Sequence, residues 1–264
     1  MYNFNYHQAK SVDEASKLVS GAEEGKLMAG GMTLLPTLKQ RLAKPSDVVD
    51  LGKIADLKGI KKEGNAIVIG AMTRHFDVAN SDVVKSAIPG LAGLAGHIGD
   101  PAVRNRGTIG GSVANNDPAA DYPSAVIALN ATITTNKRKI AADDFFKGLF
   151  ETALEPGEVI TSFSFPIPEK SHYMKFPNPA SRYAIVGVYV AKTGNDVRVA
   201  VTGAGPVVFR QKEMEAALAK NFSPDAIKDI KQKPDNLNSD IHASAEYRAH
   251  LVNVMARRAV QGCG

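Results

Sequence analysis

Two glycine pairs in polar surroundings are the residues of this chain best suited to bind an anion. Gly30–Gly31 precede Thr33, and Gly110–Gly111 follow Thr108 about eighty residues later. Glycine lets backbone N–H groups approach an anion without a Cβ in the way, and adjacent N–H groups form an anion-binding concavity. Threonine hydroxyls and a following helix N-terminus add donors. One such loop suits one phosphate, so the two together predict a pyrophosphate, and hence a dinucleotide, between two lobes.

Each pair also has a simpler interpretation, a tight turn after a strand. The same choice applies to the polar residues beyond the second pair, which are Asn115, Asn116, Asp117 and Asp121. Their amides and carboxylates could bond a ribose or ring nitrogens. Alternatively, the stretch is a helix-capping loop with Asp121 as the N-cap of the next helix. The sequence leaves both interpretations open.

Other familiar sites are missing from the sequence. No G-x-G-x-x-G follows a strand and no G-x-S-x-G is present. The stretch 21–27 resembles a phosphate loop but has too few residues between its glycines and a leucine after its lysine, so it is a polar turn. The six histidines show no metal-ligand spacing. Cys263 is the one cysteine, which excludes an internal disulfide and a thiolate-held cluster within the chain.

Composition narrows the class of protein. The chain has 264 residues, 44% of them hydrophobic and 22% charged, as in ordinary globular proteins. The net charge of +5 comes from scattered lysines and tryptophan is absent, so we expect no nucleic-acid groove. No apolar run approaches the length of a membrane span. With a single cysteine and no secretion signal recognised, a cytoplasmic location is the expectation.

The elements that must position the glycine pairs follow from periodicity. A helix over 11–21, a strand over 26–29, a helix over 33–43 and a strand over 47–51 form a small β/α unit. The first glycine pair lies between its second strand and second helix. We therefore expect that pair to form a strand–helix loop.

The middle of the chain predicts a second unit. A hairpin turns at Gly64–Asn65, and residues 75–99 are helical with a break near Pro89. Beyond the second glycine pair, 122–135 predicts a helix and then a strand, and 157–168 a strand that ends at prolines.

The last third of the chain has a different pattern of polar and apolar residues. Residues 183–205 alternate in polarity and predict two antiparallel strands, while 210–220 and 244–260 are amphipathic helices. A boundary at 167–172 separates this part, which we expect to be an α+β domain with an antiparallel sheet.

Four stretches carry a resemblance to a known family. They are "AGGMTLLPTLKQRLAKPSDVVDL", "IGDPAVRNRGTIGGSVANNDPAADYPSAVIALNA", "KFPNPASRYAIVGV" and "DIHASAEYRAHLVNVMARRAV". They resemble the FAD-binding medium subunit of the xanthine dehydrogenase and carbon monoxide dehydrogenase family of molybdenum hydroxylases. The resemblance implies a two-lobed FAD-binding domain of the vanillyl-alcohol-oxidase (PCMH) type and a small C-terminal α+β domain. The implied domains are lobe 1 at 1–55, lobe 2 at 56–170 and the C-terminal domain at 171–264.

The resemblance implies no catalytic acid or base and no metal, but it does imply which positions bind FAD. The FAD-binding positions are Leu27, Met28, Ala29, Gly30, Gly31, Met32, Thr33, Leu34, Ile98, Gly99, Thr108, Ile109, Gly110, Gly111, Ser112, Asn115, Asp117, Asp121, Ile160, Lys175 and Tyr183.

Four of these positions have implied roles on the flavin, each with a plain structural alternative. Tyr183 would cover the ring and Lys175 would favour negative charge on the reduced flavin. Ile98 and Ile160 would pack beside it. Alternatively, Tyr183 is a half-buried strand aromatic, Lys175 a solvated edge-strand lysine, and the isoleucines are core. Met32 stands where many relatives carry His, Gln or Thr, which keeps packing but loses a hydrogen bond.

The implied function is electron transfer within a heterotrimer. A large subunit with a molybdenum cofactor would oxidise the substrate, and a small subunit with [2Fe–2S] clusters would deliver electrons to this chain. FAD would pass them to NAD+, a quinone or oxygen, in a dimer of heterotrimers. A free-standing FAD-dependent oxidoreductase and a flavin-free scaffold are the alternatives. An active-site base or covalent flavin attachment would favour the former, and neither is recognisable.

Overall fold

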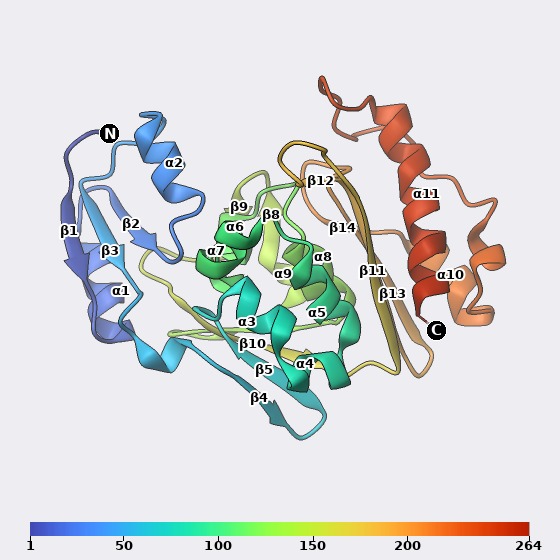
Figure 1. The fold of residues 1–264 in the computed structure, drawn as a ribbon, viewed down its shortest axis with the longest axis horizontal. Coiled ribbons are helices and arrows are strands. Elements are labelled where there is room, and N and C mark those ends of the chain that lie inside the picture. The colour runs from blue at the N-terminus through green and yellow to red at the C-terminus, as the bar shows by residue number, and fades with distance from the viewer. Residues whose placement is uncertain (264) are drawn as a thin grey trace.

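The computed structural model describes residues 1–263 and has three parts built on separate sheets (Figure 1). The first part is a parallel sheet of strand order β1-β3-β2. Parallel neighbours need crossover connections, and α2 lies in the one between β2 and β3, whereas α1 connects the two edge strands β1 and β2. The elements of this part are β1 Asn5–Gln8, α1 Val12–Gly21, β2 Gly25–Met28, α2 Leu34–Lys39, β3 Asp47–Asp50 and the 3-10 helix η1 Ala55–Leu57.

Local signals explain the first helix. The Ser11 hydroxyl accepts a hydrogen bond from the Glu14 N–H at 3.1 Å, and the Glu14 carboxylate accepts one from the Lys10 N–H at 2.7 Å. Ser11 therefore caps the start of the helix, and Glu14 binds the backbone just before it. Helix α2 ends at Lys39, earlier than the predicted 43, because Arg41 adopts a left-handed φ of 60°.

The second part is a sheet of strand order β4-β5-β10-β6-β7 covered by short helices. Its β4–β5 pair is the hairpin predicted at Gly64–Asn65. The elements are β4 Ile60–Glu63, β5 Ala66–Gly70, α3 His75–Asn80, α4 Asp82–Ala87, α5 Pro89–Gly96, α6 Pro101–Arg106, α7 Ile109–Asn115, α8 Tyr122–Ala128, β6 Thr132–Thr135, β7 Lys139–Ala141, α9 Ala142–Phe145, β8 Phe146–Gly148, β9 Glu151–Thr152 and β10 Ile160–Pro166.

The third part is an antiparallel sheet of order β11-β12-β13-β14, as expected for 183–205. Helices α10 and α11 cover its outer face and α5 and α8 its inner face (Figure 1). The elements are β11 Lys170–Pro177, β12 Ala184–Thr193, β13 Asp196–Thr202, β14 Phe209–Arg210, α10 Lys212–Lys220, η2 Pro224–Ile227 and α11 Ala245–Gly262.

One core joins the second and third parts. Tyr122 and Leu91 of the second part and Tyr189 of the third are fully buried in the same apolar cluster. A separate cluster lies under α11. In a third, small cluster, Met72 and Val159 of the second part pack against the first part.

Two expectations about the second glycine stretch need correction. The stretch after Thr108 is helix α7 rather than a loop. Asp121 occupies the N-cap position of α8, but its carboxylate makes no capping hydrogen bond, because it is engaged by Tyr173 and Lys175. No helix in residues 1–263 is long and apolar enough to cross a bilayer.

Candidate cofactor site

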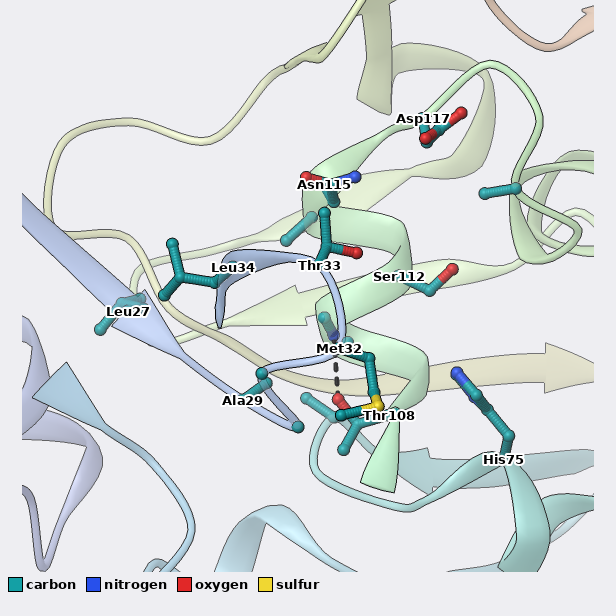
Figure 2. A pocket seen from close by; sticks show the side chains of 18 of the residues that line it. Leu27, Ala29, Met32, Thr33, Leu34, His75, Thr108, Ser112, Asn115 and Asp117 are labelled. Carbon is teal, nitrogen blue, oxygen red and sulfur yellow. Dashed lines mark hydrogen bonds between the residues drawn. The ribbon is translucent and has the colours of Figure 1, made fainter. Parts of the chain in front are cut away.

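A cavity of about 610 Å³ lies where the three parts meet. Segments far apart in sequence form its wall. The loop after β2 and helix α7 are seen in Figure 2, and the chain before β10 and the tip of the β11–β12 hairpin also line the cavity. All the predicted site residues line it except Met28, Ile109 and Lys175. Met28 ends strand β2, Ile109 is fully buried beneath the wall, and Lys175 lies behind Asp121.

The first glycine loop offers unpaired backbone donors. A Cβ on Gly30 would lie 2.0 Å from the carbonyl oxygen of Arg106, so only glycine allows this approach to α6. Gly31 has a φ of 73°, where other residues are strained. The backbone N–H groups of residues 30–34 find no acceptor within residues 1–263. Five successive free amides beside a cavity are suited to bind an anion.

The second glycine pair has a different role from the predicted one. The N–H of Gly110 donates to the carbonyl of Ala71 at 2.8 Å, and that of Gly111 to the Thr108 hydroxyl at 3.1 Å. The prediction of free amides at this pair is therefore wrong. A Cβ on Gly110 would lie 2.6 Å from the Ala71 oxygen, so this glycine is there to let α7 approach the end of β5. Ser112 and Asn115, whose side chains have no partner in the described chain, remain as donors there.

A buried ion pair joins Asp121 of the cavity wall to Lys175 behind it. The Lys175 ammonium is 3.0 Å from the Asp121 carboxylate, and their side chains are 7% and 5% exposed. Lys175 also donates to the carbonyl of His97 at 2.8 Å, and the Tyr173 hydroxyl donates to Asp121. Burial raises the pKa of Asp121, and Lys175 opposes that rise. The alternative of a solvated edge-strand lysine is therefore wrong, although β11 is an edge strand.

Tyr183 lies at the tip of the β11–β12 hairpin. Its side chain lines the cavity and is 44% exposed. The Asn178 side chain shapes this tip by accepting from the N–H of Ala180 at 2.9 Å. Burial and Asp117 raise the pKa of Tyr183, while a hydrogen bond with Thr33 of the first loop lowers it. The aromatic ring is thus placed beside the first glycine loop.

Sequence reasoning missed His75, Phe150 and Glu158, which also line the cavity. Phe150 has a φ of 56° in the β8–β9 turn. The buried Asn116 amide holds that turn by donating to the carbonyls of Gly148 and Glu151, at 2.8 Å each. The sequence offered Asn116 as a ligand-binding residue or as part of a helix-capping loop, and nothing in its sequence context indicated a distant hairpin.

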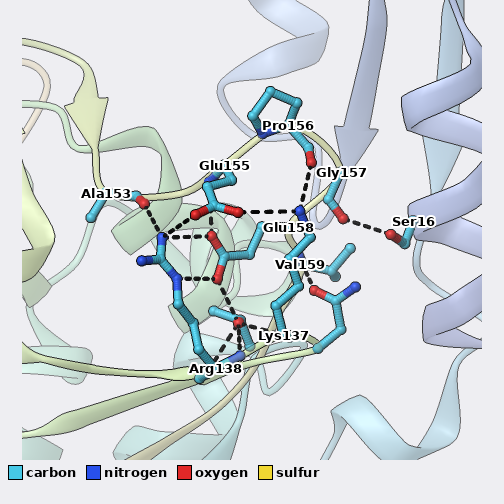
Figure 3. Close-up of polar contacts among 11 residues, drawn as sticks. Ser16, Lys137, Arg138, Ala153, Glu155, Pro156, Gly157, Glu158 and Val159 are labelled. Carbon is cyan, nitrogen blue, oxygen red and sulfur yellow. Dashed lines mark hydrogen bonds and ion pairs between the residues drawn. The ribbon is translucent and has the colours of Figure 1, made fainter.

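The Glu158 carboxylate organises the chain before β10 (Figure 3). It accepts from the Arg138 guanidinium at 3.0 Å and from the Thr135 hydroxyl at 2.7 Å. Although burial raises its pKa, these bonds and the Glu155 N–H lower it to about 2. One residue earlier, the Gly157 carbonyl accepts from the Ser16 hydroxyl of α1 at 2.7 Å. This segment therefore ties the first part of the chain to the second.

Comparisons with known proteins bear on the whole chain. A family model described as "FAD binding domain in molybdopterin dehydrogenase" matches residues 2–168, and one described as "CO dehydrogenase flavoprotein C-terminal domain" matches 171–263. The chain is 37% identical to the glyceraldehyde dehydrogenase medium chain of Sulfolobus acidocaldarius over 97% of this chain and 96% of that one. It is 35% identical to the carbon monoxide dehydrogenase medium chain of Hydrogenophaga pseudoflava, with 97% and 96% covered.

Solved structures agree with these matches. A chain of the Cu,Mo-CO dehydrogenase in its cyanide-inactivated form superposes with a TM-score of 0.88 at 32% identity, covering 100% of this chain and 98% of that one. A chain of quinoline 2-oxidoreductase from Pseudomonas putida 86 gives 0.84 at 28% identity, covering 99% and 96%. This chain belongs to the FAD-binding medium subunits of the molybdenum hydroxylase family. It is thus an oxidoreductase subunit whose cofactor is FAD, which confirms the resemblance found in the sequence.

The cavity of this medium subunit fits an FAD molecule on two observations. The free amides of residues 30–34 match the negative charge of a diphosphate. Gly30 and Gly31 line the cavity in a backbone conformation that holds these amides at its wall, because Gly30 packs against the Arg106 carbonyl and Gly31 has a left-handed φ. Apolar residues such as Leu27 and Ile160 line other stretches of the wall and suit planar rings.

Proposed function

We propose that this medium subunit holds FAD in the cavity and passes electrons from the [2Fe–2S] clusters of a small subunit to an external acceptor. The acceptor would be NAD+, a quinone or oxygen. Bound FAD supplies the redox chemistry, because a flavin accepts electrons singly and releases them in pairs. The run of free amides at residues 30–34 is the observation that carries the proposal.

The residues of the chain would bind and orient the cofactor. The amides of residues 30–34 would hold the diphosphate, with Ser112 and Asn115 as side-chain donors from α7. Tyr183 would cover one face of the flavin from the hairpin tip. The Asp121–Lys175 pair would fix the wall behind it, and because Asp121 compensates the ammonium, Lys175 carries little net charge toward the flavin. We assign the remaining predicted lining residues to packing against FAD.

The proposed assembly is a dimer of heterotrimers in the cytoplasm, with a large molybdenum-cofactor subunit and a small cluster subunit. Relatives named as medium chains support a subunit rather than a free-standing FAD-dependent oxidoreductase. The single Cys263 also means that the clusters must come from another chain. The substrate would bind in the large subunit.

A glycine replacement tests the cofactor site. Gly30→Ala places a methyl group against the Arg106 carbonyl, so we expect FAD affinity to fall at least about tenfold, or about 1.4 kcal/mol. Absorbance at about 450 nm after reconstitution with FAD reports binding. Gly93→Ala in α5, which meets nothing within 4 Å, is the matched control and should bind normally. A wild-type subunit that takes up no FAD would contradict the proposal, as would normal binding by Gly30→Ala.

A further inference from the structure

His75 is a buried histidine on the cavity wall whose ring lacks partners. It opens helix α3, is 4% exposed and lines the cavity. Its Nδ1 is buried without a hydrogen bond, and its Nε2 has no partner within residues 1–263 either. Buried polar side-chain atoms are nearly always hydrogen-bonded, so an imidazole unsatisfied at both nitrogens indicates a missing partner.

The ring is held firmly in one orientation. The backbone N–H of His75 donates to the Gly107 carbonyl at 3.0 Å. The imidazole ring packs against the Tyr122 ring, with centroids 5.4 Å apart. A Cβ on Gly107 would lie 2.6 Å from Nε2, so the imidazole occupies space that only glycine leaves open. Figure 2 shows the ring directed toward the space between Met32 and Ser112. The cavity is therefore the place where a partner can reach it.

The charge state of His75 defines what that partner is. Burial lowers its pKa to about 4, and the nearby positive charge of Arg104 adds to this, so the ring is neutral at pH 7. A neutral imidazole has one donor and one acceptor. Buried unpaired acceptors are tolerated better than unpaired N–H groups. The proton therefore belongs on Nε2, the ring nitrogen that is not fully buried, with the buried Nδ1 as the bare acceptor.

We propose that His75 is a cofactor-positioning residue that donates a hydrogen bond from Nε2 to an acceptor atom of bound FAD. This inference rests on the proposed function, because it assumes FAD in the cavity. The hydrogen bond from His75 would be a neutral, directional contact from α3, in addition to those that the first glycine loop makes with FAD. The contact would orient FAD without contributing charge to the diphosphate.

Two substitutions test the inference by separating hydrogen bonding from packing. His75→Phe keeps a ring against Tyr122 but removes the donor, and we expect FAD to bind roughly tenfold more weakly, the usual effect of losing one hydrogen bond. His75→Gln provides an amide donor near Nε2 and should recover most of the affinity. Titration of the apo-subunit with FAD, followed by flavin fluorescence, gives the dissociation constants. Phe76→Leu, at an exposed neighbour on α3, is the matched control and should bind normally.

The unfolding midpoint of each apo-subunit completes the test. His75→Phe should leave it unchanged or raise it, because an unsatisfied buried polar group is removed. Wild-type affinity in His75→Phe would overturn the inference, and so would an equal loss of affinity in His75→Phe and His75→Gln. If the wild-type subunit itself binds no FAD, the proposed function fails before the role of His75 is reached.

Discussion

The Lys175 side chain is placed by its partners rather than by its strand. The plain structural interpretation was a solvated edge-strand lysine, and the resemblance suggested a charge beside the flavin. The contacts with Asp121 and the His97 carbonyl come from residues 54 and 78 positions away. No local pattern encodes such distant pairs, so the sequence could nominate Lys175 and Asp121 but not join them.

Removing the lysine should leave a buried carboxylate without its counter-charge. For Lys175→Met we expect the free energy of unfolding to fall by about 3–5 kcal/mol. Asp121 is 5% exposed and would have to be protonated or hydrated at a cost. Urea denaturation of the apo-subunit measures the change. The double variant Asp121→Asn/Lys175→Met should recover most of the loss, and a single variant within 1 kcal/mol of wild type would show that the pair is structurally unimportant.

The two glycine loops show what pattern reading captures at the level of elements. The glycine pairs and their strand–helix setting located the cavity wall. They did not distinguish Gly31, with its left-handed φ, from Gly110, which is needed for close packing. That distinction depends on Ala71, which lies opposite Gly110 only after folding. The β8–β9 turn and helix α6 were also missed, because both are too short for periodicity to reveal.

The segment before β10 should make stability depend on acidity. Glu158 has a pKa of about 2 in the folded chain and an ordinary value of 4.5, so its contribution is complete above about 4.5 and is lost as the pH falls toward 2. The difference corresponds to on the order of 3 kcal/mol. We expect the stability gap between wild type and Glu158→Gln to shrink over that window. Chemical denaturation at a series of pH values measures it, and a constant gap would contradict the assigned role.

The domain boundary predicted at 167–172 coincides with a change of sheet, but not with a break in the core. Tyr173 and Tyr189 of the third part pack in the same cluster as Tyr122 of the second. The Thr202 hydroxyl also donates to the Ala120 carbonyl at 2.6 Å. Composition and periodicity indicated that a new sheet begins here. They could not indicate the shared core, because that depends on which faces of the sheets and helices meet, and each strand's sequence is compatible with several partners.

A chain that stops at residue 170 should therefore not fold independently. It would expose Tyr122 and Leu91, both fully buried in the whole protein, and would remove the counter-charge of Asp121. We expect a loss of near-ultraviolet circular dichroism and an aggregated or expanded species by size-exclusion chromatography. Adding residues 171–264 in trans should restore part of the signal. A monomeric, cooperatively unfolding 1–170 fragment would mean that the second part is an autonomous domain.

The cavity wall also constrains when the protein acquires its cofactor. Its segments come in the order of the first glycine loop, α7, the chain before β10 and finally Tyr183, so the last piece is synthesised when about two-thirds of the chain has been made. A nascent polypeptide on the ribosome lacks the hairpin tip until then. If the first glycine loop and Tyr183 bind FAD as proposed, a nascent chain that ends before Tyr183 would have the diphosphate-binding loop but not the aromatic ring beside it.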